Sequence, residues 1–442
     1  MQTSNDYHKK NYKKAPIKEV HLRVFLAIVL GQIACGYALG ISGTALNDAQ
    51  NYIHISDLWV GLIGAGSLLG LMGSAIMGRI ADQFGRSKML MIDMYLFALL
   101  SLLQLLTASP LALFLIRFLI GLMIAIDYTV GNSLLVEWLP LNESGKRQSQ
   151  LIIYWTIGFI LSYIAGITIH GFGSRNWQII MASSAILGLI TAIFRSVAKL
   201  PASPSWLASQ GKYKTAQKLI QKHIGKKWGL PFKLLKAKPT DSVSWKTLFT
   251  KQYRRRTLVG GLFYACQAFA FFGISIFLPI LLASMGMSDS NLSGIIYNGC
   301  MLVGVLLGSR LFQTLSRRIF LIGTFFLSAL ALLLMLLGPA HAFVFQMALF
   351  ALFSIVLSSG LTLDYPYPTE LFDIKVRATG VGTCITISRI GAASGTFLLP
   401  ILTSLGGAHL AMLVCLVVLI VGGVICLIWA PETSPKYISK NN

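Results

Sequence analysis

The chain has 442 residues, of which 55% are hydrophobic and only 12% are charged. A soluble globular domain carries about twice that charged fraction, so the composition excludes a soluble domain. Apolar stretches of about 20 residues recur from Val24 to Ala430, and this is the length that a bilayer-spanning helix requires. The sequence therefore predicts an all-α polytopic membrane protein.

The start of the chain does not resemble a cleavable signal peptide. Residues 1–18 are polar and basic, and the first apolar run is too long and lacks a small-residue cleavage site. We expect the first helix to stay as an anchor. The six cysteines all lie in apolar stretches and their spacing fits neither a metal site nor a disulfide framework, so no metal or cofactor is expected.

Twelve transmembrane helices are predicted in two six-helix bundles, with bounds uncertain by about two to four residues. The first six spans are expected at about 22–43, 58–80, 89–107, 111–137, 150–170 and 177–198. The other six are expected at about 257–284, 291–313, 319–338, 341–367, 379–404 and 408–430. The predicted domains are a basic N-terminal segment (1–21), the N-terminal bundle (22–198), a linker with short surface helices near 209–223 and 243–251 (199–256), the C-terminal bundle (257–430) and a tail (431–442).

The net charge of +22 is distributed very unevenly. With twelve spans, 34 of the 37 lysines and arginines fall on one face of the membrane, only Arg175 falls on the other, and Arg117 and Arg389 lie inside. The positive-inside rule places both termini and the linker in the cytoplasm. This bias explains the charge without a nucleic-acid partner, and a bacterial source would imply the inner membrane.

A charged turn separates the second and third predicted spans. Gly78, Asp82, Gly85 and Arg86 are spaced within it so that glycine can supply a tight turn and the charges can stay at the membrane surface. The turn resembles the signature loop of the major facilitator superfamily, and 308–318 is a weaker echo of it in the second half. The resemblance implies two six-helix repeats around a cavity near the midplane.

Further stretches resemble the sugar-porter branch of that superfamily. They are Leu115–Gly121, Pro201–Leu207, Pro366–Phe372 with Arg377, and Pro431–Thr433. Ser388–Gly391 resembles bacterial relatives that carry nicotinate-like or other small organic solutes.

The chain also departs from the sugar-porter pattern. Cys35 and Ala38 stand where related branches carry a first-helix aspartate, and Ala202 and Ser205 replace a charged pair of the gate. The glutamine pair that reads sugars is reduced to Gln267. A hexose substrate and the usual first-helix proton site are therefore disfavoured.

Charged residues inside the predicted spans are the candidates for chemistry, because a charge in the hydrocarbon region is costly. Asp127 is either a proton carrier or a structural hydrogen-bond acceptor in a kinked helix. Asp364 and Arg389 form either a structural ion pair or a site in which Arg389 binds a substrate carboxylate and frees Asp364 for protonation. Asp93 is a weaker candidate.

The resemblance suggests further roles. Tyr365 occupies the position at which the family stacks its substrate, and Gln267, Trp155 and Arg117 are candidate substrate-binding residues. Glu137, Arg147, Glu370 and Arg377 are expected to form the cytoplasmic gate with the charged turn, through interdomain pairs that hold the outward-facing state.

Together these features predict a monomeric secondary active transporter, not an enzyme, that moves a small organic solute with a proton. The solute is expected to be an organic acid or similar metabolite. A sugar or polyol symporter, an uncoupled facilitator and, more remotely, a transporter-like sensor remain as alternatives. The histidines are scattered and the sequence has no phosphate-binding loop, which disfavours a membrane enzyme and ATP-driven transport.

Overall fold

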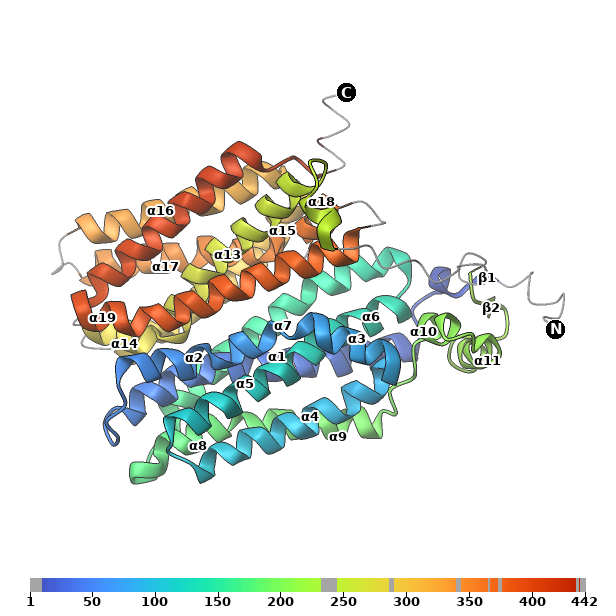
Figure 1. The fold of residues 1–442 in the computed structure, drawn as a ribbon, viewed down its shortest axis with the longest axis horizontal. Helices are drawn as coiled ribbons and strands as arrows, with labels where there is room; N and C mark the ends of the chain where they lie inside the picture. Colours follow the sequence, from blue (N-terminus) through green and yellow to red (C-terminus); the bar gives the residue numbers. More distant parts are fainter. Residues whose placement is uncertain are drawn as a thin grey trace.

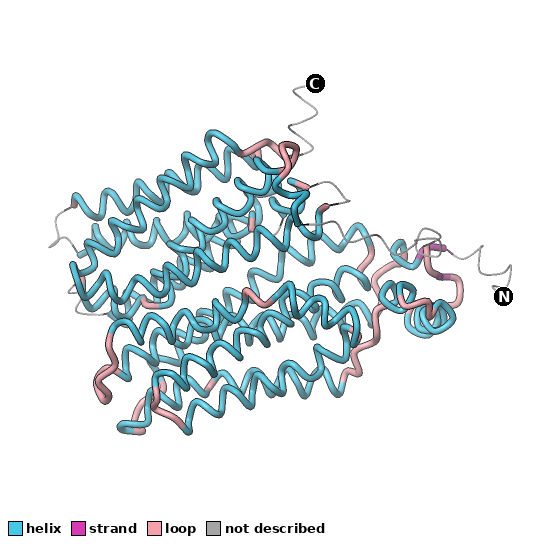
Figure 2. Tube along the Cα trace, viewed as in Figure 1, coloured by secondary structure: helices cyan, strands magenta, loops and turns pink. Residues whose placement is uncertain are grey.

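The computed structural model describes residues 10–231, 245–285, 290–338, 343–364, 366–372, 376–434 and 437. Its helices form two bundles that lie side by side, one from each half of the chain (Figure 1). Most of the described chain is helical and the connecting loops are short (Figure 2). The predicted architecture of two helical bundles is confirmed.

The N-terminal bundle contains six spans, several of them built from two consecutive helices. They are α1 (Glu19–Ala49), α2 (Asp57–Leu71) with α3 (Ser74–Phe84), α4 (Arg86–Leu103) with η3 (Gln104–Leu106), α5 (Pro110–Ile126) with η4 (Asp127–Gly131) and α6 (Asn132–Trp138), α7 (Leu141–Thr168), and η5 (Gly173–Arg175) with α8 (Asn176–Ala182) and α9 (Ser184–Val197).

The C-terminal bundle follows the short η6 helix (Trp245–Phe249). Its elements are α13 (Arg254–Ile276) with α14 (Leu278–Ser284), α15 (Ser290–Thr314), α16 (Arg317–Leu337), α17 (Phe343–Gly360) with η7 (Leu361–Leu363) and α18 (Pro366–Leu371), and α19 (Arg377–Trp429).

The continuous element α19 contains the last two predicted spans. The backbone leaves the helical region at Gly406 and Gly407, and the φ of +66° at Gly407 is one that glycine adopts easily. Eleven described helical runs are long and apolar enough to cross a membrane, and dividing α19 at these glycines gives twelve. Twelve transmembrane helices are therefore confirmed.

Some predicted boundaries are wrong. The fifth span was expected to start near residue 150, but α7 begins at Leu141, directly after Pro140, and so takes in the basic residues that were assigned to a loop. The seventh span is interrupted at Phe277, just before the Leu278–Pro279 start of α14. Proline supplies no backbone N–H, so it begins a new helix more easily than it continues an old one.

The fourth and tenth spans both leave regular α-helical geometry near an aspartate. Asp127 begins the π-helical segment η4, and Asp364 directly follows the 3-10 segment η7. Such irregular turns inside a helix are common at functional sites, because they redirect side chains and free backbone groups.

A small subdomain covers one end of the N-terminal bundle, and we call this side of the molecule the termini end (Figure 1). It contains α10 (Pro204–Ser209), α11 (Tyr213–His223) and a parallel pairing of β1 (Lys10–Asn11) with β2 (Trp228–Gly229). The Tyr12 hydroxyl anchors it by donating to the Glu137 carbonyl at 2.8 Å, and it contacts the Ser205 hydroxyl at 2.9 Å.

The all-α prediction omitted this strand pair. The two strands are more than 200 residues apart in the chain, and each is too short to show the alternating hydrophobic pattern of a strand. The surface helix expected near 209–223 corresponds to α11. A second surface helix is predicted near 243–251. The structure has the 3-10 helix η6 there, and residues 243–244 lie outside the described part of the chain.

The tail is attached to the C-terminal bundle through Glu432. Its carboxylate accepts hydrogen bonds from the Ser316 hydroxyl and from the backbone N–H groups of Arg317 (3.1 Å), Arg318 (3.2 Å) and Ser434 (2.8 Å). Burial alone would raise the pKa of Glu432, but the bonds from Ser316 and these N–H groups outweigh it and hold the pKa below its usual 4.5. The carboxylate therefore caps the first turn of α16.

Glu432→Gln is expected to lower the stability of the detergent-solubilised protein by about 1 kcal/mol at neutral pH, because the charged cap is lost. A carboxylate with a lowered folded-state pKa stabilises the fold above its unfolded pKa and loses that effect as the pH falls through the folded value. Thermal unfolding should therefore separate wild type from variant at pH 7 and not well below pH 4.5. Glu19→Gln, which removes an exposed i,i+4 pair with Arg23 at the start of α1, is the control with a small effect at both pH values. An equal Tm for wild type and Glu432→Gln at pH 7 would contradict the capping role.

Candidate functional site

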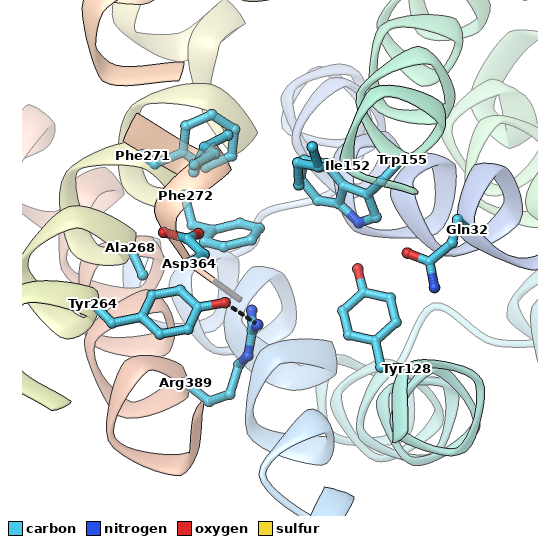
Figure 3. A pocket seen from close by; sticks show the side chains of 11 residues that line it. Gln32, Tyr128, Ile152, Trp155, Tyr264, Ala268, Phe271, Phe272, Asp364 and Arg389 are labelled. Atoms are coloured by element: carbon cyan, nitrogen blue, oxygen red, sulfur yellow. Dashed lines mark hydrogen bonds between the residues drawn. The ribbon is translucent and has the colours of Figure 1, made fainter. Parts of the chain in front are cut away.

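A cavity with a mainly apolar wall and a few polar groups lies between the two bundles (Figure 3). The N-terminal bundle contributes side chains from α1, η4 and α7, and the C-terminal bundle contributes side chains from α13, η7, the residue after η7 and α19. Its lining consists of Gln32, Tyr128, Ile152, Trp155, Tyr264, Ala268, Phe271, Phe272, Leu361, Asp364 and Arg389. The wall is largely aromatic, with one cation and one carboxylate from the same bundle.

Arg389 is the cation of this cavity, and its side chain reaches from α19 toward the opposite bundle (Figure 3). It is only 3% exposed and donates from Nη2 to the Tyr264 hydroxyl at 3.2 Å. Its guanidinium carbon lies 5.7 Å from the ring centre of Tyr264 and 6.0 Å from those of Tyr128 and Phe272. Three aromatic faces thus surround the guanidinium and hold it by cation–π attraction.

Asp364 lies beside this cation, on the irregular part of the tenth span. Its side chain is 5% exposed and the charge of Arg389 acts on it. Its Oδ1 has no hydrogen-bond partner among the described residues. Because a buried oxygen of this kind is costly to leave unsatisfied, it is an open acceptor at the cavity wall.

Trp155 lies on the N-terminal side of the cavity and belongs to an aromatic cluster that crosses between the bundles. Its ring centre is 5.4 Å from that of Phe159, 6.1 Å from Phe271 and 6.0 Å from Phe272. Its indole Nε1 has no hydrogen-bond partner among the described residues. The side chain therefore packs the interface and also presents a donor at the cavity wall.

Of the predicted substrate-binding residues, Arg389 and Trp155 line the cavity, and so does the predicted proton carrier Asp364. Gln267 is buried one position before the lining residue Ala268, and Arg117 donates from Nη1 to the Ala38 carbonyl at 2.9 Å, away from this lining. Tyr365 lies outside the described residues. The substrate roles of these residues stay predictions.

Asp127 lies in a buried charge cluster beside the cavity. Arg195, at the end of α9, pairs from Nη2 with Asp127 and from Nη1 with Asp93, 3.2 Å away. All three side chains are at most 1% exposed. Gln32 connects the two sites, because it lines the cavity and its carboxamide lies near the Asp127 carboxylate.

The assignment of Arg195 to the basic membrane surface is wrong. Its guanidinium is fully buried inside the N-terminal bundle, where Nε also donates to the Ala27 carbonyl at 3.1 Å and Nη1 to the Leu90 carbonyl at 3.0 Å. The signal in the sequence was its place one turn before the end of an apolar span, from which a long side chain can point inward.

The residues predicted to form the gate lie at the termini end. Arg86 pairs with Glu137 inside the N-terminal bundle, and Glu370 pairs with Arg317 at 3.5 Å inside the C-terminal bundle. Arg147 lies 3.7 Å from Glu143 and stacks over Phe25.

The glycines of the charged turn support the predicted tight geometry. Gly85 has a φ of +97°, and Gly78 lies close to Thr129, so that a Cβ there would be 3.2 Å from its methyl group. The side chains of Asp82 and Arg377 lie outside the described part of the structure. The interdomain gate stays a prediction.

At the other end of the molecule the bundles are in backbone contact. A Cβ on Gly43 of α1 would overlap the carbonyl oxygen of Ile276 in α13, and one on Gly61 of α2 would overlap that of Phe397 in α19. Glycine is required at both positions for this close approach. The described conformation is therefore closed at the end opposite the termini.

Two six-helix bundles around a charged cavity, joined by a basic linker and carrying the glycine turn, define a transporter of the major facilitator superfamily. The family model "Sugar (and other) transporter" matches residues 10–441, and the chain belongs to that family. It is thus a multi-pass membrane protein of a family that transports small solutes, as predicted.

Two curated relatives and one solved structure illustrate the range of similar proteins. The chain is 34% identical over 424 residues to the inner membrane metabolite transport protein YgcS of Escherichia coli, covering 95% of this chain and 93% of YgcS. It is 24% identical over 432 residues to the niacin transporter NiaP of Acinetobacter baylyi, covering 95% and 96%. The xylose transporter XylE of E. coli, in a partially occluded inward open conformation, superposes with a TM-score of 0.77 at 16% identity, covering 93% and 98%, which supports the fold.

Proposed function

We propose that this protein is a proton-coupled symporter that imports a small carboxylated organic solute by alternating access. The observation that carries the proposal is the buried Arg389 guanidinium on the cavity wall, held between aromatic faces and beside Asp364. A guanidinium can bind a carboxylate through two parallel hydrogen bonds that are strengthened by the opposite charges, and a neutral sugar lacks that charge.

The aromatic wall favours a compact solute with an apolar body. Trp155, Phe271 and Phe272 offer ring faces, while the Trp155 N–H and the Gln32 amide offer polar contacts opposite Arg389. Cavities of this composition bind ligands by apolar burial and orient them through a few polar groups. The similar protein NiaP is a niacin transporter, and a carboxylated ring such as niacin fits this description of the solute.

Proton coupling is proposed to use Asp127 and Asp364, one in each bundle. Both carboxyl groups are buried, and each is opposed by an arginine, Arg195 or Arg389. A solute carboxylate that binds Arg389 competes with Asp364 for the same positive charge, which favours protonation of Asp364.

The described conformation is proposed to be inward-facing, with the termini end in the cytoplasm and the backbone contacts of Gly43 and Gly61 closing the outside. The concentration of basic residues at the termini end supports this orientation. Alternation would then break these contacts and join the two bundles at the charged turn, through the gate residues.

Solute uptake into proteoliposomes under an imposed inward proton gradient tests the proposal. Labelled nicotinate and benzoate are the carboxylate probes, labelled xylose is the sugar probe, and Arg175→Ala is the control variant far from the cavity. We expect accumulation of a carboxylate, with acidification of a trapped pH dye, faster and to a higher level than the passive entry of the neutral acid produces in protein-free liposomes. Accumulation of xylose alone would make the protein a sugar symporter, and equilibration without acidification would make it a facilitator. Either result would overturn the proposal.

A further inference from the structure

The charge cluster of Asp93, Asp127 and Arg195 contains two acids and one base. We propose that this cluster binds one exchangeable proton at Asp127, with Asp93 as the acid that stays ionised and Arg195 as the fixed counter-charge. The place of this proton in solute transport rests on the proposed function, but its binding to the cluster does not.

The argument begins with the hydrogen bonds of Arg195. Nε donates to Ala27, Nη1 donates to Leu90 and to both oxygens of Asp93, at 3.2 and 3.4 Å, and Nη2 donates to Asp127. Every nitrogen of the guanidinium therefore has an acceptor. Arg195 neutralises one carboxylate, and the other is left as a net negative charge in a site that is at most 1% exposed. An uncompensated charge buried at this depth takes up a proton instead of remaining ionised.

The hydrogen bonds also distinguish the two acids. Asp93 accepts from the backbone N–H of Met94 at 2.6 Å in addition to both of its contacts with Arg195, and these bonds favour its ionised form. Asp127 accepts from Arg195 only at Oδ2 and has the Gln32 carboxamide as a weaker neighbouring donor, while among the described residues no donor meets hydrogen-bond geometry at Oδ1. Oδ1 is therefore the atom at which an O–H bond can form.

The Asp127 carboxylate packs tightly against α1 and lies next to a residue of the cavity wall. A Cβ on Gly31 would overlap Oδ2 and would be 2.7 Å from Oδ1, so only the lack of a side chain at this position lets the carboxylate fit. Gln32, the next residue, lines the cavity and lies near Asp127, which gives a proton a route between the cavity and Oδ1. On binding, water gives up a proton and the O–H bond forms at Oδ1. On release that bond breaks and the proton returns to water.

The neighbouring elements add few competing charges. Cys35 of α1 is a titratable group beside the cluster, and its thiol is neutral in its ordinary state. Other charged groups of the packed helices have partners elsewhere or lie in solvent: Arg117 of α5 bonds Ala38, Glu137 of α6 pairs with Arg86 of α4, and Arg79 of α3 is exposed. His21 of α1 accepts at Nδ1 from the backbone of Lys18, near the termini end. Within the described residues, Arg195 is thus the cation that sets the charge of the cluster.

Infrared difference spectroscopy of the purified full-length protein tests the inference without any solute. At about pH 7 carboxylates with ordinary pKa values near 4 are ionised, so a protonated carboxyl band reports buried acids. We expect such a band in the wild type and its disappearance on raising the pH. Either Asp93→Asn or Asp127→Asn alone should remove the contribution of the cluster completely, because the acid that remains is then neutralised by Arg195.

Arg195→Gln is expected to change the intensity of the protonated carboxyl band in the opposite direction. Without the cation both acids are expected to be protonated, so the contribution of the cluster should about double, which a merely structural arginine would not produce. Asp57→Asn, at the start of α2 and far from the cluster, is the control and should leave the band unchanged. A band of undiminished intensity in both single asparagine variants, or no band in the wild type, would overturn the proposal, whereas a residual band of lower intensity belongs to other buried acids such as Asp364. Because the wild-type measurement needs no variant, poor folding of a variant does not leave the question undecided.

Transport gives a separate readout. Each asparagine variant fixes the cluster at zero net charge, so we expect it to lose accumulation driven by a proton gradient and to keep exchange of labelled nicotinate for unlabelled nicotinate. If the infrared result holds and no carboxylate is transported, the cluster binds a proton and the proposed solute is wrong. If gradient-driven accumulation persists in both variants, the cluster is not the coupling site.

Discussion

Replacing Arg389 with alanine is expected to raise the KM for a carboxylate substrate by about 30- to 150-fold. The substitution removes a charge-assisted bidentate contact worth about 2–3 kcal/mol, and 1.4 kcal/mol corresponds to a factor of ten. The residue is 3% exposed and already held by Tyr264, so little of its conformational freedom is lost when solute binds. Initial rates of nicotinate uptake in proteoliposomes at increasing concentration measure the effect.

The controls separate recognition from folding. Arg389→Lys keeps the charge but not the planar fork, so an intermediate loss of about tenfold is expected. Because Arg389→Ala leaves Asp364 buried without its neighbouring charge, the double variant Arg389→Ala/Asp364→Asn should recover thermal stability without recovering affinity. An unchanged KM in a well-folded Arg389→Ala protein would mean that the carboxylate is not bound by this residue.

Gly43→Ala is expected to shift the protein away from the described conformation. The new Cβ would overlap the carbonyl oxygen of Ile276, so the bundles must separate at this end. Overpacking of this kind costs about 1–3 kcal/mol, which changes a two-state ratio by about 5- to 150-fold. Pulsed electron paramagnetic resonance should record a longer distance between a spin label at position 54, in the loop before α2, and one at the exposed position 404, in α19 just before its break at Gly406.

The matched control is Gly299→Ala in α15, where the added Cβ meets nothing within 4 Å. It should leave the label distance as in the wild type. Because transport needs both conformations, Gly43→Ala should also slow solute exchange, even if the protein folds normally. A label distance in Gly43→Ala equal to that in the control would show that this contact does not hold the end closed.

The class of protein followed from the sequence because its signals are local. A bilayer requires a run of apolar residues of fixed length, and the charged turn at Gly85 needs only a few neighbouring residues to be recognised. The same local logic identified Arg389, Asp364 and Asp127 as buried charges, because each lies deep inside an apolar run. Their substrate and proton roles remain predictions that the experiments above can test.

What surrounds those charges was decided only by the packing of the helices. In a span that is apolar on all sides, the sequence does not tell which face is turned inward, so Tyr264, Phe272 and Tyr128 could not be assigned to Arg389. Arg195 looked like one more basic residue of the membrane surface, whereas the packing of α9 against α4 and η4 buries it between two acids. The sequence by itself determined the membrane spans and most of the residues that carry charge into them, with Arg195 as the exception. Only the tertiary structure decided which charges meet, because those partners come from helices that are distant in the chain and are brought together by packing alone.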